Sequence, residues 1–290
     1  MKRKMILILT GVLAFGVLSA CGTPNEDAHS SGGTNQNQEN SAAPSTGHGE
    51  HGGHGASEQP ADNYKPSFSF ASGTAKANEK SKLDIQIADS KGNVVNDYEL
   101  SHEKLLHLIV VNHDLSYFNH IHPEFDGNGN FSIDTSFPGG GDYKLFVDFV
   151  PKGGSSTTLS EWVKVEGEEK AHEAINADEK LVKVVDGKEV ELTLSSTKAQ
   201  DEVTLTFNIA DVQTNKGISN LEQYLGAVGH VVVLSDDAEK YLHVHPLDEK
   251  ATGPKAEFMT SFPKSGTYKI WGQFQHQGKV FTVPFVVDIK

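Results

Sequence analysis

The chain carries one pattern of histidines twice, and this pattern could bind metal. Each copy reads H-x12-H-x-H-P, and the two copies end at Pro123 and Pro246. Histidine is the commonest metal ligand among side chains, and neutral imidazole suits copper and zinc. A repeated triad at fixed spacing therefore predicts one metal site in each copy. The six predicted ligands are His107, His120, His122, His230, His243 and His245.

Two β-hairpins must position these triads. In the second copy, residues 231–234 predict a strand, residues 235–240 a turn and residues 241–245 a return strand. Residues two apart on a strand share a face, so His243 and His245 are expected to point to one side.

The pairing of the hairpin decides whether the third histidine joins them. If Leu234 lies opposite Tyr241, then His230 lies directly opposite His245 and diagonally from His243. The same register in the first copy would bring its three histidines together. A slip of one residue would send the first histidine of each triad to the opposite face.

The remaining histidines are less informative. His276, on a late strand, could be a fourth ligand or a rim residue. The others outside the two triads and the N-terminal segment are expected to face solvent; these are His102, His113 and His172.

The donor set favours Cu²⁺ over Zn²⁺ and argues against a Cu⁺ carrier, because Cu⁺ prefers thiolate and thioether ligands. Cys21 is the only cysteine, and Met259 is the only methionine outside the first five residues. Three histidines also leave coordination positions open, which suits exchange of the ion with a partner.

The N-terminus predicts export and lipidation. Three cations, Lys2, Arg3 and Lys4, precede an apolar run at residues 5–17, and Leu-Ser-Ala then precedes Cys21. This is typical of a lipoprotein signal peptide at residues 1–20 whose cysteine is lipidated, although a plain secretory signal with a stray cysteine would look similar. The protein would then be anchored to the cell membrane on its extracytoplasmic face.

Residues 21–64 predict a disordered tether, because they contain almost no large apolar side chain. His48, His51 and His54 form a histidine-rich tract inside it, which is either a flexible metal-capture segment or a low-complexity linker.

The rest of the chain is a domain duplication. Three segments recur at an offset of 122 to 125 residues; residues 87–89, 135–138 and 141–144 reappear at 209–211, 260–263 and 266–269. This predicts one domain at residues 65–167, a linker at 168–180 and a second domain at 181–290.

Each copy is expected to be all-β. Residues 83–87 and 203–207 alternate apolar and polar side chains, and residues 143–150 and 268–274 look like late strands entered through a glycine turn. The expected fold is two tandem immunoglobulin-like, or cupredoxin-like, β-sandwiches. A short helix could lie at residues 219–225.

Two segments of the second copy resemble a known family. Residues 224–232 read YLGAVGHVV and residues 241–246 read YLHVHP. These resemble the signatures of a family of bacterial secreted proteins and lipoproteins with YtkA-like β-sandwich modules, often linked to heavy-metal and particularly copper handling. The first copy departs from this pattern, since it lacks YLGA and reads FNHIHP at residues 118–123. The metal role that the resemblance implies is therefore firmer for His230, His243 and His245 than for the first triad.

Together these features predict a lipid-anchored protein that captures or buffers divalent copper or zinc and is not an enzyme. The formal charge of −14 would become −17 once Lys2, Arg3 and Lys4 are removed, which argues against nucleic-acid binding. One alternative is a β-sandwich adhesion or assembly module with structural histidines. Another is a metallohydrolase, but the sequence offers no paired carboxylate or nucleophile motif to support it.

Overall fold

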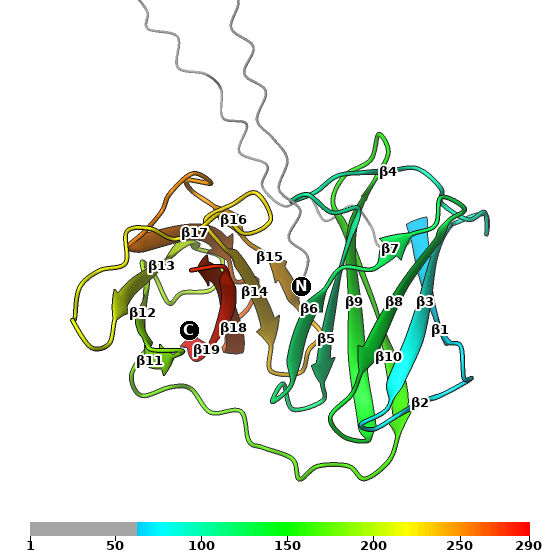
Figure 1. The fold of residues 1–290 in the computed structure, drawn as a ribbon, viewed down its shortest axis with the longest axis horizontal. Helices are drawn as coiled ribbons and strands as arrows, with labels where there is room; N and C mark the ends of the chain where they lie inside the picture. The colour runs from blue at the N-terminus through cyan, green and yellow to red at the C-terminus, as the bar shows by residue number, and fades with distance from the viewer. Residues whose placement is uncertain (1–62) are drawn as a thin grey trace, which may run out of the picture. The chain divides into compact units, whose positions relative to one another are not determined.

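A computed structural model describes residues 63–290, apart from the side chain of His243. The predicted signal peptide, the lipidated Cys21, the tether and its His48, His51 and His54 lie outside the described residues. All regular elements within residues 63–290 are strands (Figure 1), and this part of the chain holds no helix that could span a membrane.

The helix expected at residues 219–225 is absent. Two single bridges, Glu222 with Gln275 and Tyr224 with Ala227, occupy this segment instead. The side chain of Leu221 is buried in the core, and its backbone N–H donates to the carbonyl of Thr252 rather than along a helix. Long-range pairing thus satisfies the backbone groups that a helix would have paired locally.

The first domain is a sandwich of two sheets. One is ordered β1-β3-β8-β7 and the other β2-β10-β9-β5-β6, with β4 also pairing with β9. The strands are β1 (Tyr64–Phe70), β2 (Ala75–Lys76), β3 (Lys80–Asp89), β4 (Tyr98–Glu99), β5 (Leu106–Asn112), β6 (Phe118–Ile121), β7 (Glu124–Phe125), β8 (Asn130–Ser136), β9 (Gly141–Pro151) and β10 (Thr157–Glu166).

The second domain repeats this plan, so the chain is two tandem immunoglobulin-like sandwiches, as predicted. Its sheets are ordered β11-β12-β13-β17-β16 and β15-β14-β18-β19. The strands are β11 (Val182–Val185), β12 (Lys188–Leu194), β13 (Glu202–Asp211), β14 (His230–Ser235), β15 (Tyr241–His243), β16 (His245–Pro246), β17 (Lys255–Ser261), β18 (Gly266–His276) and β19 (Lys279–Ile289).

A tyrosine anchors the same corner in each sandwich. Tyr143 donates from its hydroxyl to the carbonyl of Gly139 at 3.0 Å, and Tyr268 donates to the carbonyl of Lys264 at 2.9 Å. Both rings are buried against the core. Strands β9 and β18 begin just before these tyrosines at glycines with positive φ, as the glycine turns predicted.

Removing the hydroxyl in Tyr143→Phe is expected to lower the free energy of unfolding by about 1–2 kcal/mol, because a buried carbonyl loses its donor. Urea denaturation would measure the loss. Tyr117→Phe is the matched control, since its hydroxyl makes a longer bond of 3.4 Å to the exposed Ser136 carbonyl. Equal losses in the two variants would contradict the assigned role of the Tyr143 bond.

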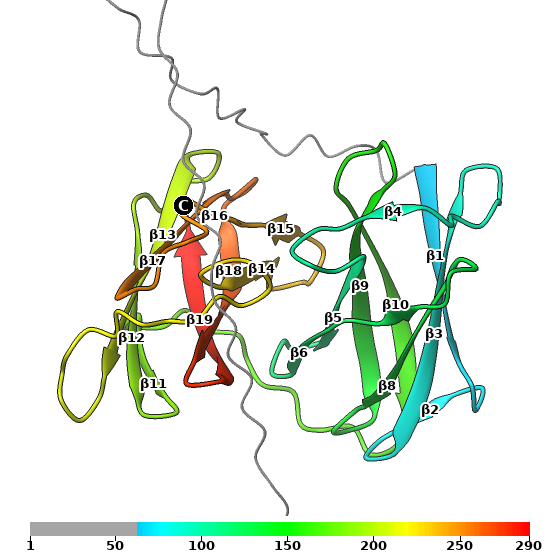
Figure 2. The ribbon, with the colours of Figure 1, turned by 45° about the horizontal axis from the view of Figure 1, so that its top comes forward.

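A third apolar cluster joins the two sandwiches, which belong to one compact unit. On β5, Leu108 and Val110 point into the first core, whereas Ile109 and Val111 join this cluster. Side chains alternate in the same way on the other strands that contribute, so one face of each sheet builds its own core and the other face builds the joint cluster. The sheet with β5 and β9 and the sheet with β14 and β18 lie on the facing sides of the two sandwiches (Figure 2). The interface cluster consists of Ile109, Val111, Leu115, Phe146, Val232, Leu234, Ala238 and Trp271.

Two equivalent lysines also cross between the sandwiches. Lys144, almost fully buried, forms a 2.6 Å ion pair with Glu239 of the second domain. Lys269 donates to the carbonyl of Leu115 of the first domain at 2.8 Å. Each lysine therefore reaches the hairpin turn of the opposite sandwich, and the interface is polar at its margins as well as apolar at its centre.

Candidate metal centre

The first histidine triad lies on the hairpin β5–β6 in the predicted register. Leu108 pairs with Ile121 and Ile109 pairs with His120, so the next step along the hairpin brings His107 and His122 together. Because His107 has the parity of Ile109, it lies on the face that the second sandwich covers.

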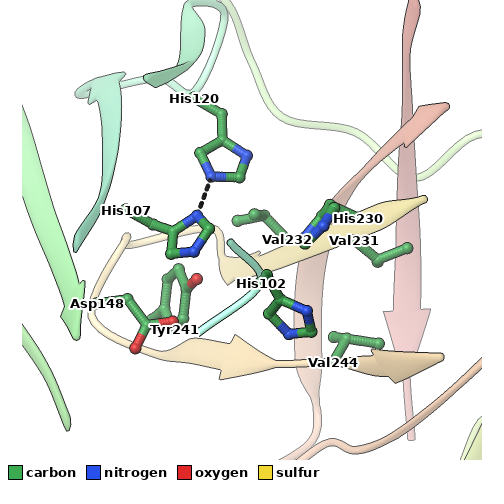
Figure 3. Close-up of a pocket in the computed structure, with 9 residues that line it drawn as sticks. All are labelled: His102, His107, His120, Asp148, His230, Val231, Val232, Tyr241 and Val244. Carbon is green, nitrogen blue, oxygen red and sulfur yellow. Dashed lines mark hydrogen bonds between the residues drawn. The ribbon is translucent and has the colours of Figure 1, made fainter. Parts of the chain in front are cut away.

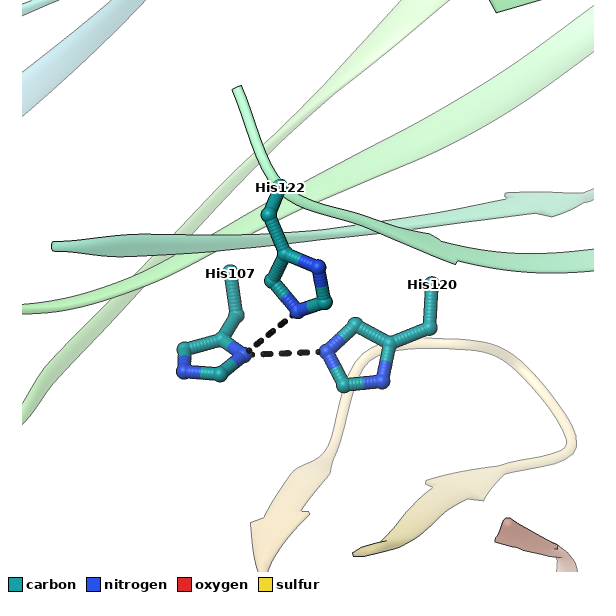
Figure 4. A group of neighbouring side chains, drawn as sticks. All are labelled: His107, His120 and His122. Carbon is teal, nitrogen blue, oxygen red and sulfur yellow. Dashed lines mark hydrogen bonds between the residues drawn. The ribbon is translucent and has the colours of Figure 1, made fainter. Parts of the chain in front are cut away.

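The three imidazoles converge (Figure 4). The Nδ1 of His107 lies 3.0 Å from the Nε2 of His120 and 3.1 Å from the Nε2 of His122, and the three ligand atoms all lie within 4.8 Å of one another. Two ligands bound tetrahedrally at about 2.05 Å from zinc would be about 3.3 Å apart. The triad is therefore close to the spacing that a bound ion requires, and a small side-chain adjustment would admit the ion.

Hydrogen bonds on the outer side of two rings set their tautomers. The Nε2 of His107 lies 2.9 Å from the carbonyl oxygen of Ser101, which can only accept. The Nδ1 of His120 lies 2.6 Å from the Oε1 of Gln273, whose amide nitrogen donates to Thr282 at 3.1 Å. Each neutral ring thus carries its proton outward.

The inner nitrogens of these two rings are left with lone pairs. In the neutral forms, His107 Nδ1 and His120 Nε2 face each other at 3.0 Å and neither has a proton to donate. The Nε2 of His122 can donate to His107 Nδ1 at 3.1 Å, and a cation at this place could instead be shared by all three rings. Metal-binding histidines usually show this arrangement, with the outer N–H held by a carbonyl or carboxylate and the inner nitrogen on the ion.

The surroundings keep the rings of His120 and His122 neutral. Burial, followed by the neighbouring His107 and His122, lowers the pKa of His120 to about 3. Burial, followed by His107 and Lys104, lowers the pKa of His122 to about 3. Ligand lone pairs are therefore available at neutral pH without prior loss of a proton.

The second triad is arranged differently. Leu234 pairs with Tyr241 as predicted, and Val232 pairs with His243, but β15 ends there. His245 belongs to β16 in the other sheet, where it lies opposite Met259 and is exposed. The predicted opposition of His230 and His245 is therefore wrong.

The two copies differ in where the chain crosses between the sheets. Val244 is buried in the core of the second sandwich, and the next residue, His245, already pairs in the other sheet. In the first copy the chain crosses between Ile121 and Glu124, so His120 stays on its strand and His122 stays beside His107. Among the described side chains, the first triad is the group of three that could hold an ion.

His230 does not stand apart from this centre, because it lies next to the first triad. Its ring centroid is 6.1 Å from those of His107 and His120, and 4.7 Å from that of His102. Burial, followed by His102, His120 and His107, lowers the pKa of His230 to about 2. His102 had been expected to face solvent; it is instead half-buried beside His230.

The rings of His102, His107, His120 and His230 line a small shared cavity of about 20 Å³ (Figure 3). Asp148 of β9, directly opposite His107, contributes a buried carboxylate to the lining. Neither Asp148 nor the proximity of His230 to the first triad was predicted from the sequence. An acidic residue inside the apolar strand at residues 143–150 was the available signal for Asp148.

The other histidines lie elsewhere. His113 is exposed and stacks near Trp162 and His172, as expected for a solvent-facing residue. His276 is half-buried at the end of β18, where it acts electrostatically on Asp211 and Glu222. The suggestion that it supplies a fourth ligand stays a prediction.

A glycine sets the position of His230. A side chain at Gly229 would place its Cβ 2.5 Å from the ring of Phe274 and 2.6 Å from the carbonyl oxygen of Gln273. The glycine before the histidine in the YLGA-x-GH segment therefore allows β14 to pack closely on β18, and His230 then lies opposite Gln273.

Solved structures with some likeness to the chain include bacterial surface proteins, a marsupial T cell receptor and tandem domains of titin. An Escherichia coli adhesin, FdeC, is 14% identical over 78% of this chain and 64% of its own, with a TM-score of 0.26. Invasin, titled a bacterial integrin-binding protein, is 11% identical over 77% of this chain and 39% of its own, with a TM-score of 0.23. Domains 4 and 5 of the S-layer protein SbsC are 14% identical over 76% of this chain and 96% of theirs, with a TM-score of 0.21. At these TM-scores the likeness carries no functional argument.

No curated protein matches the chain. The family described as "Domain of unknown function (DUF8832)" matches residues 59–167 and again residues 183–290, which is one match for each sandwich. The match does not show the YtkA-like or heavy-metal resemblance, which stays a prediction. The chain belongs to the DUF8832 family and carries two copies of its domain.

Proposed function

We propose that this protein is a lipid-anchored, extracytoplasmic metal-binding protein that captures or buffers a divalent transition metal. The first sandwich would hold the ion through His107, His120 and His122. Copper as Cu²⁺ is favoured, since it binds nitrogen ligands most tightly among the common divalent ions, and zinc is the second choice.

One observation carries this proposal. Two of the three rings point lone pairs at each other at 3.0 Å, while their outer nitrogens are held by Ser101 and Gln273. Together with the Nε2 of His122, 3.1 Å from His107, they bring three imidazole nitrogens together, and neutral imidazole nitrogens are good ligands for divalent copper and zinc. The arrangement also provides the outer hydrogen bonds that a bound ion needs.

The N-terminal segment has its own part in the proposal. Lipidation at Cys21 would fix the protein to the membrane, and the tether histidines His48, His51 and His54 would gather ions for the sandwiches. With the disorder that the sequence predicts, a tether of about 40 residues would reach roughly 35 Å, which is enough to deliver an ion to a folded domain.

Metal uptake by the full chain and by a variant with His48, His51 and His54 changed to alanine would test the proposal. We expect the variant to keep at least one tightly bound Cu²⁺ or Zn²⁺ per chain, because the sandwich site does not need the tether. The unmodified chain should bind additional, weaker ions. Isothermal calorimetry with metal analysis gives the number of bound ions and their affinities for both proteins. A variant that binds no metal would refute the proposed sandwich site.

The alternative function, an adhesion or assembly module with structural histidines, has one observation in its favour. The Nε2 of His122 can donate to His107 without any metal, at 3.1 Å, so the triad can stiffen the hairpin by itself. The two functions differ in one measurement. An ion at 100 times its dissociation constant stabilises a folded protein by about 2.7 kcal/mol, so metal should raise the melting temperature only if it binds.

A further inference from the structure

One nitrogen near the triad has no partner. The Nε2 of His230 is buried and makes no hydrogen bond among the described residues, and no other buried side-chain nitrogen or oxygen there is in this state. The other ring nitrogen interacts with the backbone of Leu225. The Nε2 of His230 is therefore a buried ring nitrogen that is available to a ligand.

The sheet positions place this nitrogen at the interface. His230 shares the face of Val232 and Leu234, which join the cluster between the sandwiches. It lies opposite Gln273, the residue that holds His120 across the interface. The second sandwich therefore presents two neighbouring side chains to the triad of the first.

The ring of His230 lies slightly farther from the triad than the triad rings lie from one another, as expected for a fourth ligand in the absence of an ion. Ring centroids within the triad lie 4.8 to 5.3 Å apart, and the His230 centroid lies 6.1 Å from two of them. The cavity among His102, His107, His120, Asp148 and His230 has a volume of about 20 Å³, which is enough for one water-sized occupant. Side-chain shifts of this size are common when a ligand binds.

We infer that His230 completes the first triad across the interface, so that one divalent ion is held by four histidines from both sandwiches. This inference rests on the proposed function, and it adds that the ion clamps the two domains together. Four nitrogen ligands are the closed, tetrahedral arrangement of a structural zinc site, whereas three would leave one position open. Metal loading would then also tighten the contact between the domains.

The test uses the full chain with the three tether histidines replaced, and Co²⁺ and Zn²⁺ as probes. Loss of a residue that only holds a metal ligand in place costs about 10- to 100-fold in affinity. His230→Ala removes a ligand itself, so we expect it to weaken Zn²⁺ binding by at least this much. The visible absorption of bound Co²⁺ should also change, because the ion loses one nitrogen ligand. His113→Ala, which removes an exposed imidazole of the first sandwich, is the matched control and should change neither value.

A second measurement reports the clamp itself. Lys170 and Lys180, exposed in the segment between the sandwiches, are trypsin sites. Zn²⁺ should slow their cleavage in the parent chain and have no such effect in His230→Ala. His230→Gln keeps a polar side chain at this position and serves as a second variant should the alanine variant fold poorly. It is expected to show the same loss of binding and of protection.

The outcomes separate the two proposals. If the parent chain takes up no ion, the proposed function itself fails. If the parent binds an ion and His230→Ala and His230→Gln bind it equally well with the same Co²⁺ spectrum, only the four-histidine site is overturned. It is also overturned if His102→Ala, and not His230→Ala, weakens binding, because the fourth ligand would then come from the first sandwich.

Discussion

His120→Ala is expected to weaken Cu²⁺ or Zn²⁺ binding by more than about 100-fold, the upper end of what outer-shell substitutions cost. His120 is the ring that both domains hold, since its inner nitrogen faces His107 and its outer nitrogen meets Gln273. Its loss removes a ligand and the link between the ion and the second sandwich. Competition with a chelator of known affinity would measure the change.

Two further variants show whether this loss is a ligand effect. Gln273→Ala keeps all three imidazoles but frees the outer nitrogen of His120, so a smaller loss of about 10- to 100-fold is expected. His113→Ala removes an exposed imidazole on the same sandwich and should leave the affinity unchanged. If His120→Ala and His113→Ala bind metal equally, the triad is not the site.

Much of the architecture could be predicted because it is local. Leu83, Ile85 and Ile87 alternate with more exposed residues on β3, and the equivalent residues on β13 do the same. This period of two identifies a strand with one buried face without knowledge of its partners. The repeated segments then extended the same fold to the second copy.

The register of the second hairpin was also predictable, but the length of its return strand was not. Turn geometry fixed the pairing of Leu234 with Tyr241 and of Val232 with His243. Whether the strand continues to His245 depends on which sheet buries Val244, and that is decided by contacts far away in the sequence. The resemblance to known motifs favoured the second triad, whereas the backbone gathers the first.

The interface could be expected only in part. The runs at residues 106–111 and 230–234 lack polar alternation, which is typical of strands buried on both faces. This signal indicates that something covers the outer face of each sheet. It does not identify the cover as the other sandwich, so the position of His230 beside His107 could not be derived.

Trp271→Ala is expected to destabilise the protein by about 3–5 kcal/mol, the usual cost of removing a large core side chain. Trp271 is 3% exposed, belongs to the interface cluster and stacks on Phe118 of the other sandwich, with centroids 4.6 Å apart. The core of the second sandwich does not use this ring. The variant should therefore separate the two domains rather than unfold either, and calorimetry should resolve two transitions where the parent shows one.

Trp162, the only other tryptophan, provides the matched control. Its side chain is partly exposed on the first sandwich, and the cation–π contact with Lys144 that Trp162→Ala removes is worth about 1 kcal/mol or less. Because His230 reaches the triad only while the sandwiches are docked, Trp271→Ala should also weaken Zn²⁺ binding, and Trp162→Ala should not. A Trp271→Ala protein that unfolds in one transition with parental stability would show that the interface cluster does not hold the domains together.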